Sequence, residues 1–366
     1  MTTPTHSIIP RAKTRTVTIG LVPVGGDAPV AVQSMCDTDT RDVAATVAQI
    51  HAMEAAGCEI TRVAVPDEDA ADAIALIRPQ ISIPLVADIH FDWRLAIRAA
   101  QNGADKLRIN PGNIGGPGKI AEIVACAKDH GLPIRVGVNQ GSIETDLLDK
   151  YGGNNPESLV ESALRNAAII AEHDFHDIVL SLKSSHAADV IAAYRSVAAQ
   201  CDYPLHLGVT EAGPPGSGTL KSAVALGTLL AEGIGDTIRI SLTGDKAAEI
   251  EAAWGILQAL GLRRRGPELV SCPACGRIEI DILTLVSEVQ ATLRQIRAPL
   301  TVAVMGCVVN GPGEARDADW GIFGGKDVYL LTRKGEIVDR FTDSESAKKA
   351  LTSALLEADA AWRRGG

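Results

Sequence analysis

One pattern of apolar and polar positions repeats along most of the chain, from about residue 30 to about residue 260. Each repeat is a short apolar, often β-branched run, usually followed by an alanine-rich segment with apolar residues at helical spacing, as in 42–56 and 157–172. The pattern predicts eight strands alternating with helices. The predicted strands are 30–35, 59–65, 85–89, 106–110, 134–139, 177–183, 205–209 and 237–242.

Eight strand–helix units without a break predict an α/β fold closed into a (β/α)8 TIM barrel, which we place at residues 1–260. An open, doubly wound parallel sheet is the alternative. No Gly-x-Gly-x-x-Gly motif follows the first predicted strand, so the dinucleotide-binding form of that sheet is disfavoured.

A basic stretch punctuated by glycine and proline, 261–267, ends the repeat and is typical of a linker. The segment 261–366 then predicts a second, small α+β domain. Its predicted elements are a helix at 281–296, a strand at 300–305, a hairpin of 327–331 with 337–341, and a final helix capped by Asp343 or Ser344.

Composition narrows the classes of function. The 366 residues contain 35 Lys and Arg against 45 Asp and Glu, a net charge of −10, and 3% aromatic residues, which disfavours general nucleic-acid binding. No apolar run approaches the roughly 18 residues that span a bilayer, and residues 1–16 hold no apolar signal segment. We expect a cytoplasmic protein without a membrane partner, and seven cysteines in a chain of this size favour thiol or metal chemistry over a disulfide framework.

Positive charge gathers at the carboxyl ends of five predicted strands, the end at which TIM barrels carry their active sites. These cations are Arg62, Arg108, Arg135, Lys183 and Arg239, and the polar residues that share their strand faces are Asn110, Asn139 and Ser241. Inward-pointing cations repel one another and need an anion, and a diphosphate is suited because arginine grips phosphoryl oxygens bidentately. The alternative is that each arginine pairs with a helix carboxylate outside the barrel.

Two residues in and after the seventh predicted strand, His206 and Glu211, are candidates for a proton donor. A lone histidine within a strand is more often a hydrogen-bonded structural residue, so Glu211 is the preferred candidate. A carboxyl group beside bound phosphates can have a raised pKa and hold a proton for delivery. On the third predicted strand, Asp88 shares a face with His90.

Three cysteines of the second domain have the spacing of a metal site. Cys272 and Cys275 form a Cys-x-x-Cys pair, and Cys307 precedes a Gly-Pro-Gly turn that leads to Glu314. Spacing alone leaves two interpretations open: a 4Fe–4S cluster with Glu314 as a weak, displaceable fourth ligand, or a closed structural zinc site. The other thiols are interpreted as packed residues.

The motifs together identify a resemblance. The chain closely resembles the 4-hydroxy-3-methylbut-2-en-1-yl diphosphate synthase family of the methylerythritol phosphate route to isoprenoids, in its shorter bacterial form. The motifs that carry the resemblance are Val32-Gln-Ser-Met35, Thr61-Arg-Val-Ala-Val-Pro66, Ala87-Asp-Ile-His90, Leu107-Arg-Ile-Asn-Pro-Gly-Asn113, Arg135-Val-Gly-Val-Asn139, Leu205-His-Leu-Gly-Val-Thr-Glu211, Ser271-Cys-Pro-Ala-Cys-Gly-Arg277 and Met305-Gly-Cys-Val-Val-Asn-Gly-Pro-Gly-Glu-Ala315.

The resemblance implies a TIM barrel followed by a 4Fe–4S domain, and an oxidoreductase that opens 2-C-methyl-D-erythritol 2,4-cyclodiphosphate with two electrons from ferredoxin or flavodoxin. It implies that Glu211, with Asp88 nearby, faces the reacting carbons. The implied cluster ligands are Cys272, Cys275, Cys307 and Glu314, and the implied diphosphate ligands are Arg62, Arg108, Asn110, Arg135, Asn139, Lys183, Arg239 and Ser241.

Chain topology adds one expectation. The eighth helix should end at the amino-terminal face of the barrel, away from the cations, and a linker of about a dozen residues spans at most roughly 40 Å. We therefore expect a two-fold homodimer in which each cluster domain covers the partner's barrel. Two other functions remain open. One is a barrel transferase or aldolase that acts on a phosphorylated substrate and has a structural zinc in the second domain, and the other is an iron–sulfur redox sensor whose barrel binds an anionic metabolite.

Overall fold

The computed structural model describes residues 9–307 and 316–365. The chain divides into two compact units between Arg263 and Arg264, inside the expected linker. Among the described residues, no helix is long and apolar enough to cross a membrane.

The first unit contains eight parallel strands, and each overlaps a predicted one. They are β3 (Ala31–Val32), β4 (Thr61–Ala64), β5 (Leu85–Asp88), β6 (Lys106–Ile109), β7 (Ile134–Asn139), β8 (Ile178–Lys183), β9 (His206–Leu207) and β10 (Thr237–Ile238). The strands pair in the orders β4-β5-β6-β7-β8 and β3-β10-β9. Parallel bridges between Gln33 and Ile60 and between Leu180 and Leu205 join the two sheets into a ring, which confirms the (β/α)8 barrel.

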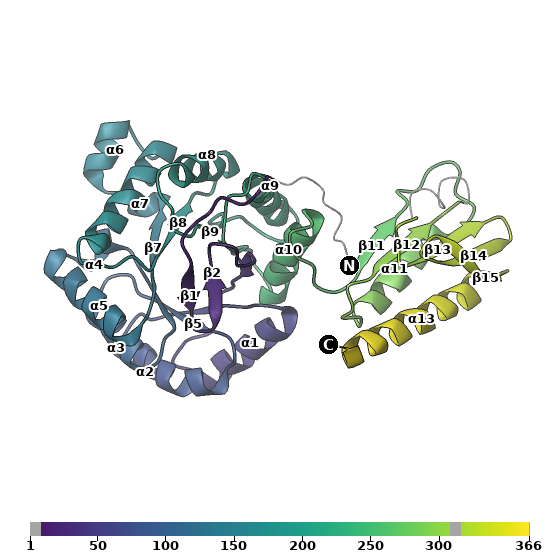
Figure 1. Ribbon diagram of the computed structural model, residues 1–366, viewed down its shortest axis with the longest axis horizontal. Coiled ribbons are helices and arrows are strands. Elements are labelled where there is room, and N and C mark those ends of the chain that lie inside the picture. The colour runs from purple at the N-terminus through teal and green to yellow at the C-terminus, as the bar shows by residue number, and fades with distance from the viewer. Residues whose placement is uncertain (1–8, 308–315, 366) are drawn as a thin grey trace. The chain divides into compact units, whose positions relative to one another are not determined.

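Helices surround the strands as a ring (Figure 1). The eight main helices are α1 (Val43–Ala56), α2 (Glu68–Ile77), α3 (Trp93–Gln101), α5 (Pro117–His130), α7 (Pro156–Ala171), α8 (Ala187–Ala198), α9 (Ser217–Ala231) and α10 (Lys246–Ala259), with two short ones, α4 (Pro111–Ile114) and α6 (Thr145–Tyr151). Aspartates start several of them: the side chains of Asp42, Asp67 and Asp92 accept hydrogen bonds from first-turn amides. Apolar residues of the strands and helices pack into one continuous core, which holds the strands rigidly.

A hairpin that the sequence analysis did not anticipate closes the floor of the barrel. Strands β1 (Val17–Ile19) and β2 (Val22–Val24) pair through a two-residue turn at Gly20, which has φ +56°. Ile19 and Val24 pack with Ala31, Ile60 and Val86 of the barrel strands. In Figure 1 the hairpin lies in the middle of the ring of helices. The amino-terminal end of the barrel is therefore filled, and the opposite end is left for a ligand.

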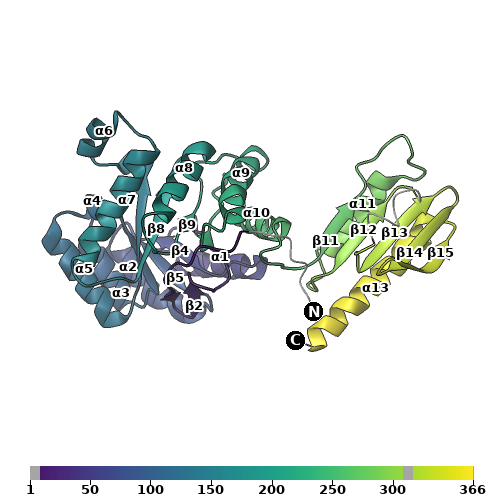
Figure 2. The same ribbon diagram turned by 45° about the horizontal axis from the view of Figure 1, so that its top comes forward.

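The second unit is an α+β domain, as predicted. Its mixed sheet has the order β11-β12-β13-β14-β15, and Figure 2 shows the sheet with its long final helix. Residues of α11, α13 and one sheet face share an apolar core. The sequence analysis missed β11 and β13. The elements are β11 (Glu268–Ser271), α11 (Ile282–Leu293), β12 (Thr301–Met305), β13 (Trp320–Gly325), β14 (Val328–Arg333), β15 (Glu336–Phe341) and α13 (Ser344–Gly365).

The floor hairpin predicts a matched pair of mutants. Ile19 is 0% exposed and Leu21, in the turn, is 93% exposed. Ile19→Ala should lower the free energy of unfolding of the barrel by about 3 kcal/mol, because it leaves a cavity against the strand starts, while Leu21→Ala should change it by less than about 0.5 kcal/mol. Urea denaturation followed by circular dichroism measures both. Equal effects of the two mutations would show that the hairpin is not part of the barrel core.

Candidate functional site

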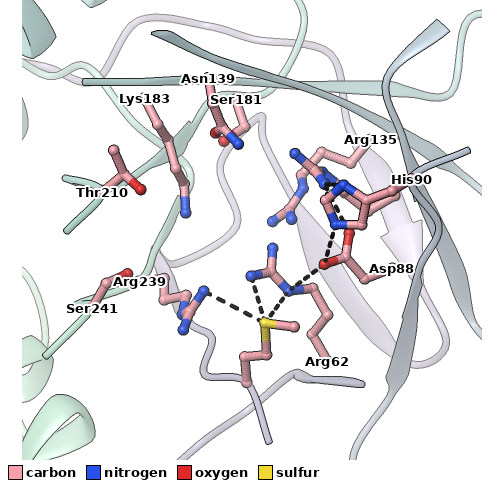
Figure 3. A pocket seen from close by; sticks show the side chains of 12 residues that line it. Arg62, Asp88, His90, Arg135, Asn139, Ser181, Lys183, Thr210, Arg239 and Ser241 are labelled. Atoms are coloured by element: carbon pink, nitrogen blue, oxygen red, sulfur yellow. Dashed lines mark hydrogen bonds and ion pairs between the residues drawn. The ribbon is translucent and has the colours of Figure 1, made fainter. Parts of the chain in front are cut away.

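A pocket of about 180 Å³ lies where the barrel strands end. Side chains from many strands converge on it, as Figure 3 shows. Its lining residues are Met35, Arg62, Asp88, His90, Arg108, Arg135, Asn139, Ser181, Lys183, Thr210, Arg239 and Ser241. All five cations proposed from the sequence therefore meet at this pocket. Arg239 also lies near a helix carboxylate, because its Nε is 4.0 Å from Glu249 Oε2 of α10.

Glycine on a neighbouring strand makes room for one of these cations. Gly137 of β7 lies beside Arg108 of β6, and a Cβ atom at Gly137 would be 2.4 Å from the Arg108 Nε. A strand glycine often marks such a close approach. The Arg-x-Gly-x-Asn pattern of β7 thus leaves space for the Arg108 guanidinium between Arg135 and Asn139.

Asp88 is the carboxylate within the pocket. Its Oδ1 accepts a hydrogen bond from Arg108 Nη1 at 3.0 Å, and its Oδ2 lies 3.8 Å from Arg62 Nε and 3.4 Å from His90 Nε2. Burial alone would raise the pKa of this carboxyl, but Arg62, His90 and Arg108 hold the pKa of Asp88 well below its usual range. Asp88 is therefore suited to orient cations and is a poor source of protons.

Two of the remaining cations, Arg135 and Lys183, form no ion pair with a carboxylate among the described residues. Burial lowers the pKa of Arg135 and of Lys183, and the neighbouring cations lower both further. A guanidinium still keeps its proton in a protein. The Nε and Nη1 of Arg135 and the Nε atoms of Arg108 and Arg239 have no hydrogen-bond partner among the described residues. Several N–H donors in the barrel thus lack an acceptor, which is the chemistry that binds a polyanion.

A sixth cation, Lys106, lies deeper and was not identified from the sequence. It points inward two residues before Arg108 and pairs in register with Val86, which touches the floor hairpin. Lys106 is 0% exposed and its Nζ has no partner among the described residues. Burial, then Arg135 and Arg62, lower the pKa of Lys106 well below its usual value. A lysine two positions before an inward arginine was the available sequence signal.

Three other predicted or considered residues lie outside the pocket lining. Asn110 is buried and its side chain accepts a hydrogen bond from the Gly112 amide, so it caps α4. Glu211 is exposed directly after Thr210, which does line the pocket, and has φ +51°. This left-handed backbone costs a non-glycine residue about 1 kcal/mol and is typical of functional positions. His206 is buried, and its Nδ1 lies 2.7 Å from Thr237 Oγ1.

The three cysteines of the second unit lie at one edge of its sheet. Cys272 directly follows β11, Cys307 comes soon after β12, and these parallel strands are neighbours with Ser271 in register with Val304. Cys275, in the same loop as Cys272, is exposed. Thiolates are the usual ligands of iron–sulfur clusters, so the donor type and placement fit such a group. Within residues 9–307 and 316–365, however, no three metal-ligating side chains have gathered at one point. Glu314 lies outside the described residues.

Comparison with known proteins places the chain in a family. The GcpE TIM-barrel domain matches residues 14–254, and the GcpE protein C-terminal domain matches residues 268–356. The chain belongs to the GcpE family. The two GcpE domains coincide with the two structural units, and the resemblance identified from the motifs is confirmed.

Curated relatives of this GcpE chain bear one name, 4-hydroxy-3-methylbut-2-en-1-yl diphosphate synthase (flavodoxin). The protein of Lawsonia intracellularis is 56% identical, covering 90% of this chain and 91% of the relative. That of Symbiobacterium thermophilum is 54% identical, covering 96% and 93%. Among solved structures, the dihydropteroate synthase of Yersinia pestis matches with a TM-score of 0.48 at 15% identity, covering 67% of this chain and 98% of that chain.

Lys106 predicts an unusual pH dependence of stability in this GcpE barrel. Because its pKa is lowered in the folded protein, the unfolded chain binds more protons than the folded chain at any pH between the lowered pKa and the ordinary lysine pKa of 10.5. Burial of Lys106 therefore costs stability at pH 7, and this cost declines as the pH approaches 10.5. Lys106→Met should stabilise the barrel by about 2 kcal/mol at pH 7 and by less at pH 10.

Urea denaturation at the two pH values measures the effect of Lys106→Met. The control is Lys13→Met, which replaces an exposed lysine and should change stability by less than about 0.5 kcal/mol at both pH values. Destabilisation by Lys106→Met at pH 7 would mean that the amine has a stabilising partner in the folded protein.

Proposed function

We propose that this chain is a 4-hydroxy-3-methylbut-2-en-1-yl diphosphate synthase. It would convert 2-C-methyl-D-erythritol 2,4-cyclodiphosphate into 4-hydroxy-3-methylbut-2-enyl diphosphate and water, consuming two electrons and two protons. The observation that carries the proposal is the set of buried cations without enough carboxylates, found in a chain whose curated relatives bear that enzyme's name.

Barrel residues divide into those that bind the diphosphate and those that position the binding residues in this proposal. The cations bind the diphosphate, and Asn139 and Ser241 donate neutral hydrogen bonds to it. The diphosphate-binding cations are Arg62, Arg108, Arg135, Lys183 and Arg239. Asp88 fixes Arg108 in place. Asn110 contributes to diphosphate binding indirectly, because its side chain caps α4 and so shapes the turn that follows β6.

Glu211 is the proposed proton donor. Glu211 has a left-handed backbone conformation and directly follows the pocket residue Thr210, which supports a place for it near the pocket. Fixed cations at mid-depth would leave the carbon end of the substrate toward the mouth of the pocket, where a carboxyl group can protonate the departing oxygen.

The proposed cofactor is a 4Fe–4S cluster held by Cys272, Cys275 and Cys307, with Glu314 as the fourth ligand. When bound, such a cluster supplies electrons singly and a Lewis-acidic iron. Flavodoxin, which appears in the relatives' names, is the proposed electron donor, and ferredoxin is the other candidate. The free thiols of this protein suit the reducing cytoplasm.

Anaerobic purification tests this function. The protein should contain iron and acid-labile sulfide and convert the cyclic diphosphate when reduced flavodoxin is supplied. Cys275→Ala should lose iron and turnover but keep its affinity for the diphosphate, since Cys275 lies outside the barrel. A colourless protein that contains zinc, or an iron protein without substrate turnover, would contradict the proposal.

We also propose a homodimer in which each cluster domain serves the partner's barrel. Arg263 anchors the start of the linker: it donates to the Val30 carbonyl at 2.8 Å and makes two hydrogen bonds to Glu59. Val30 immediately precedes β3, and Glu59 lies two residues before the start of β4. The linker thus leaves the barrel at the end opposite the pocket. Because the linker is short, this favours a dimer in which the cluster domain of one chain acts at the barrel of the other.

Mixed dimers test this arrangement. A Cys307→Ala chain and a Glu211→Gln chain should each be inactive alone. Combined, they should regain about a quarter of the wild-type activity, because half of the dimers are mixed and each holds one intact pair of barrel and cluster domain. Subunit exchange followed by an activity assay measures this, and two Glu211→Gln chains provide the control. Absence of activity in verified mixed dimers would overturn the proposal that each cluster domain acts at the partner's barrel.

A further inference from the structure

A methionine stands between two of the pocket arginines. Arg62 directs Nε and Nη2 at the Met35 Sδ, at 3.0 and 2.7 Å, and Arg239 Nη1 lies 3.6 Å from the same sulfur. Figure 3 shows these contacts as dashed lines that meet at the sulfur atom. Two guanidinium groups thus share one uncharged acceptor.

A thioether is a weak hydrogen-bond acceptor, while a guanidinium is best satisfied by a carboxylate or a phosphate. Neither arginine has such a partner at hydrogen-bond distance among the described residues. The nearest carboxylate oxygens are Asp88 Oδ2, 3.8 Å from Arg62 Nε, and Glu249 Oε2, 4.0 Å from Arg239 Nε. The sulfur therefore occupies a position that an oxyanion would fill better.

Barrel topology explains why this residue can reach both cations. Strand β3 pairs with β10 on one side, and the bridge from Gln33 to Ile60 joins it to β4 on the other. Arg62 lies on β4 and Arg239 directly follows β10. Met35 points inward from the chain that continues β3, so its side chain separates two like charges from neighbouring strands.

We propose that Met35 is a positioning residue for the diphosphate: its sulfur holds Arg62 and Arg239 in their binding orientations and gives way when a phosphoryl oxygen takes its place. This inference rests on the proposed diphosphate-binding function. Methionine suits the role because its side chain is unbranched and flexible, so it can withdraw without strain. Without the sulfur, both guanidiniums are free to rotate, and binding must order them.

The test is Met35→Leu, which nearly preserves volume and removes the acceptor. Because a ligand must then order both arginines, Met35→Leu should bind inorganic diphosphate about tenfold more weakly than the wild type. Its KM for the cyclic diphosphate should rise about tenfold, and its kcat should stay within about twofold of the wild type. Titration calorimetry and anaerobic kinetics measure these values. Met53→Leu is the matched control, since Met53 is buried in α1 away from the pocket, and it should change neither.

A second measurement follows the sulfur directly in the wild-type protein. The chain has four methionines, and methyl-labelled methionine gives each its own NMR signal, with that of Met35 assigned by its loss in Met35→Leu. Inorganic diphosphate should shift the Met35 signal and leave that of Met53 in place.

The outcomes separate the two proposals. A wild-type protein that neither binds inorganic diphosphate nor converts the cyclic diphosphate would overturn both. Diphosphate binding with an unmoved Met35 signal would overturn the inference alone. So would a Met35→Leu protein with unchanged KM, or one in which kcat falls while KM stays constant.

Discussion

The barrel buries more positive charge than its own carboxylates balance. Five cationic side chains line the pocket and the buried amine of Lys106 lies below them, while the carboxylates that meet the cations are Asp88 within the pocket and Glu249 behind it. Removing guanidinium and ammonium groups from water costs free energy, and their mutual repulsion adds to the cost. The fold must supply that free energy elsewhere, and an anionic ligand recovers part of it on binding.

The apolar shell of the barrel supplies the free energy that offsets the burial of these cations. The outer strand faces and the ring of helices form one continuous core, and the β1–β2 hairpin seals the floor with Ile19 and Val24. Because the cations stand on rigid strands, they cannot swing outward to relieve their repulsion. The glycine at position 137 and the thioether of Met35 then set how closely the guanidiniums approach their neighbours. The site is thus organised for an anion before one arrives.

The sequence predicted the repeated elements well because each barrel strand has a clear apolar run. It missed β1 and β2, which are three residues each and include Pro23, and β13, whose glycines at 321, 324 and 325 weaken the strand pattern. Alternation along strands predicted which residues face inward. Alternation did not predict how deep a side chain lies, so Lys106 at the floor was overlooked. Alternation also did not predict that Asn110 caps α4, because that role depends on the turn that Pro111 begins.

Depth within the barrel also orders the chemistry of the proposed reaction. Lys106 and His206 lie buried toward the floor, the arginines occupy the middle, and His90 and Thr210 line the pocket nearer its mouth, with Glu211 exposed directly after Thr210. An anion is attracted most strongly where the cations converge, so the uncharged end of a phosphorylated ligand must face the mouth. A proton donor and an electron source are then needed at the mouth and nowhere deeper. In the proposed reaction, that division would let one rigid barrel hold the substrate while the domain with three cysteines supplies the electrons.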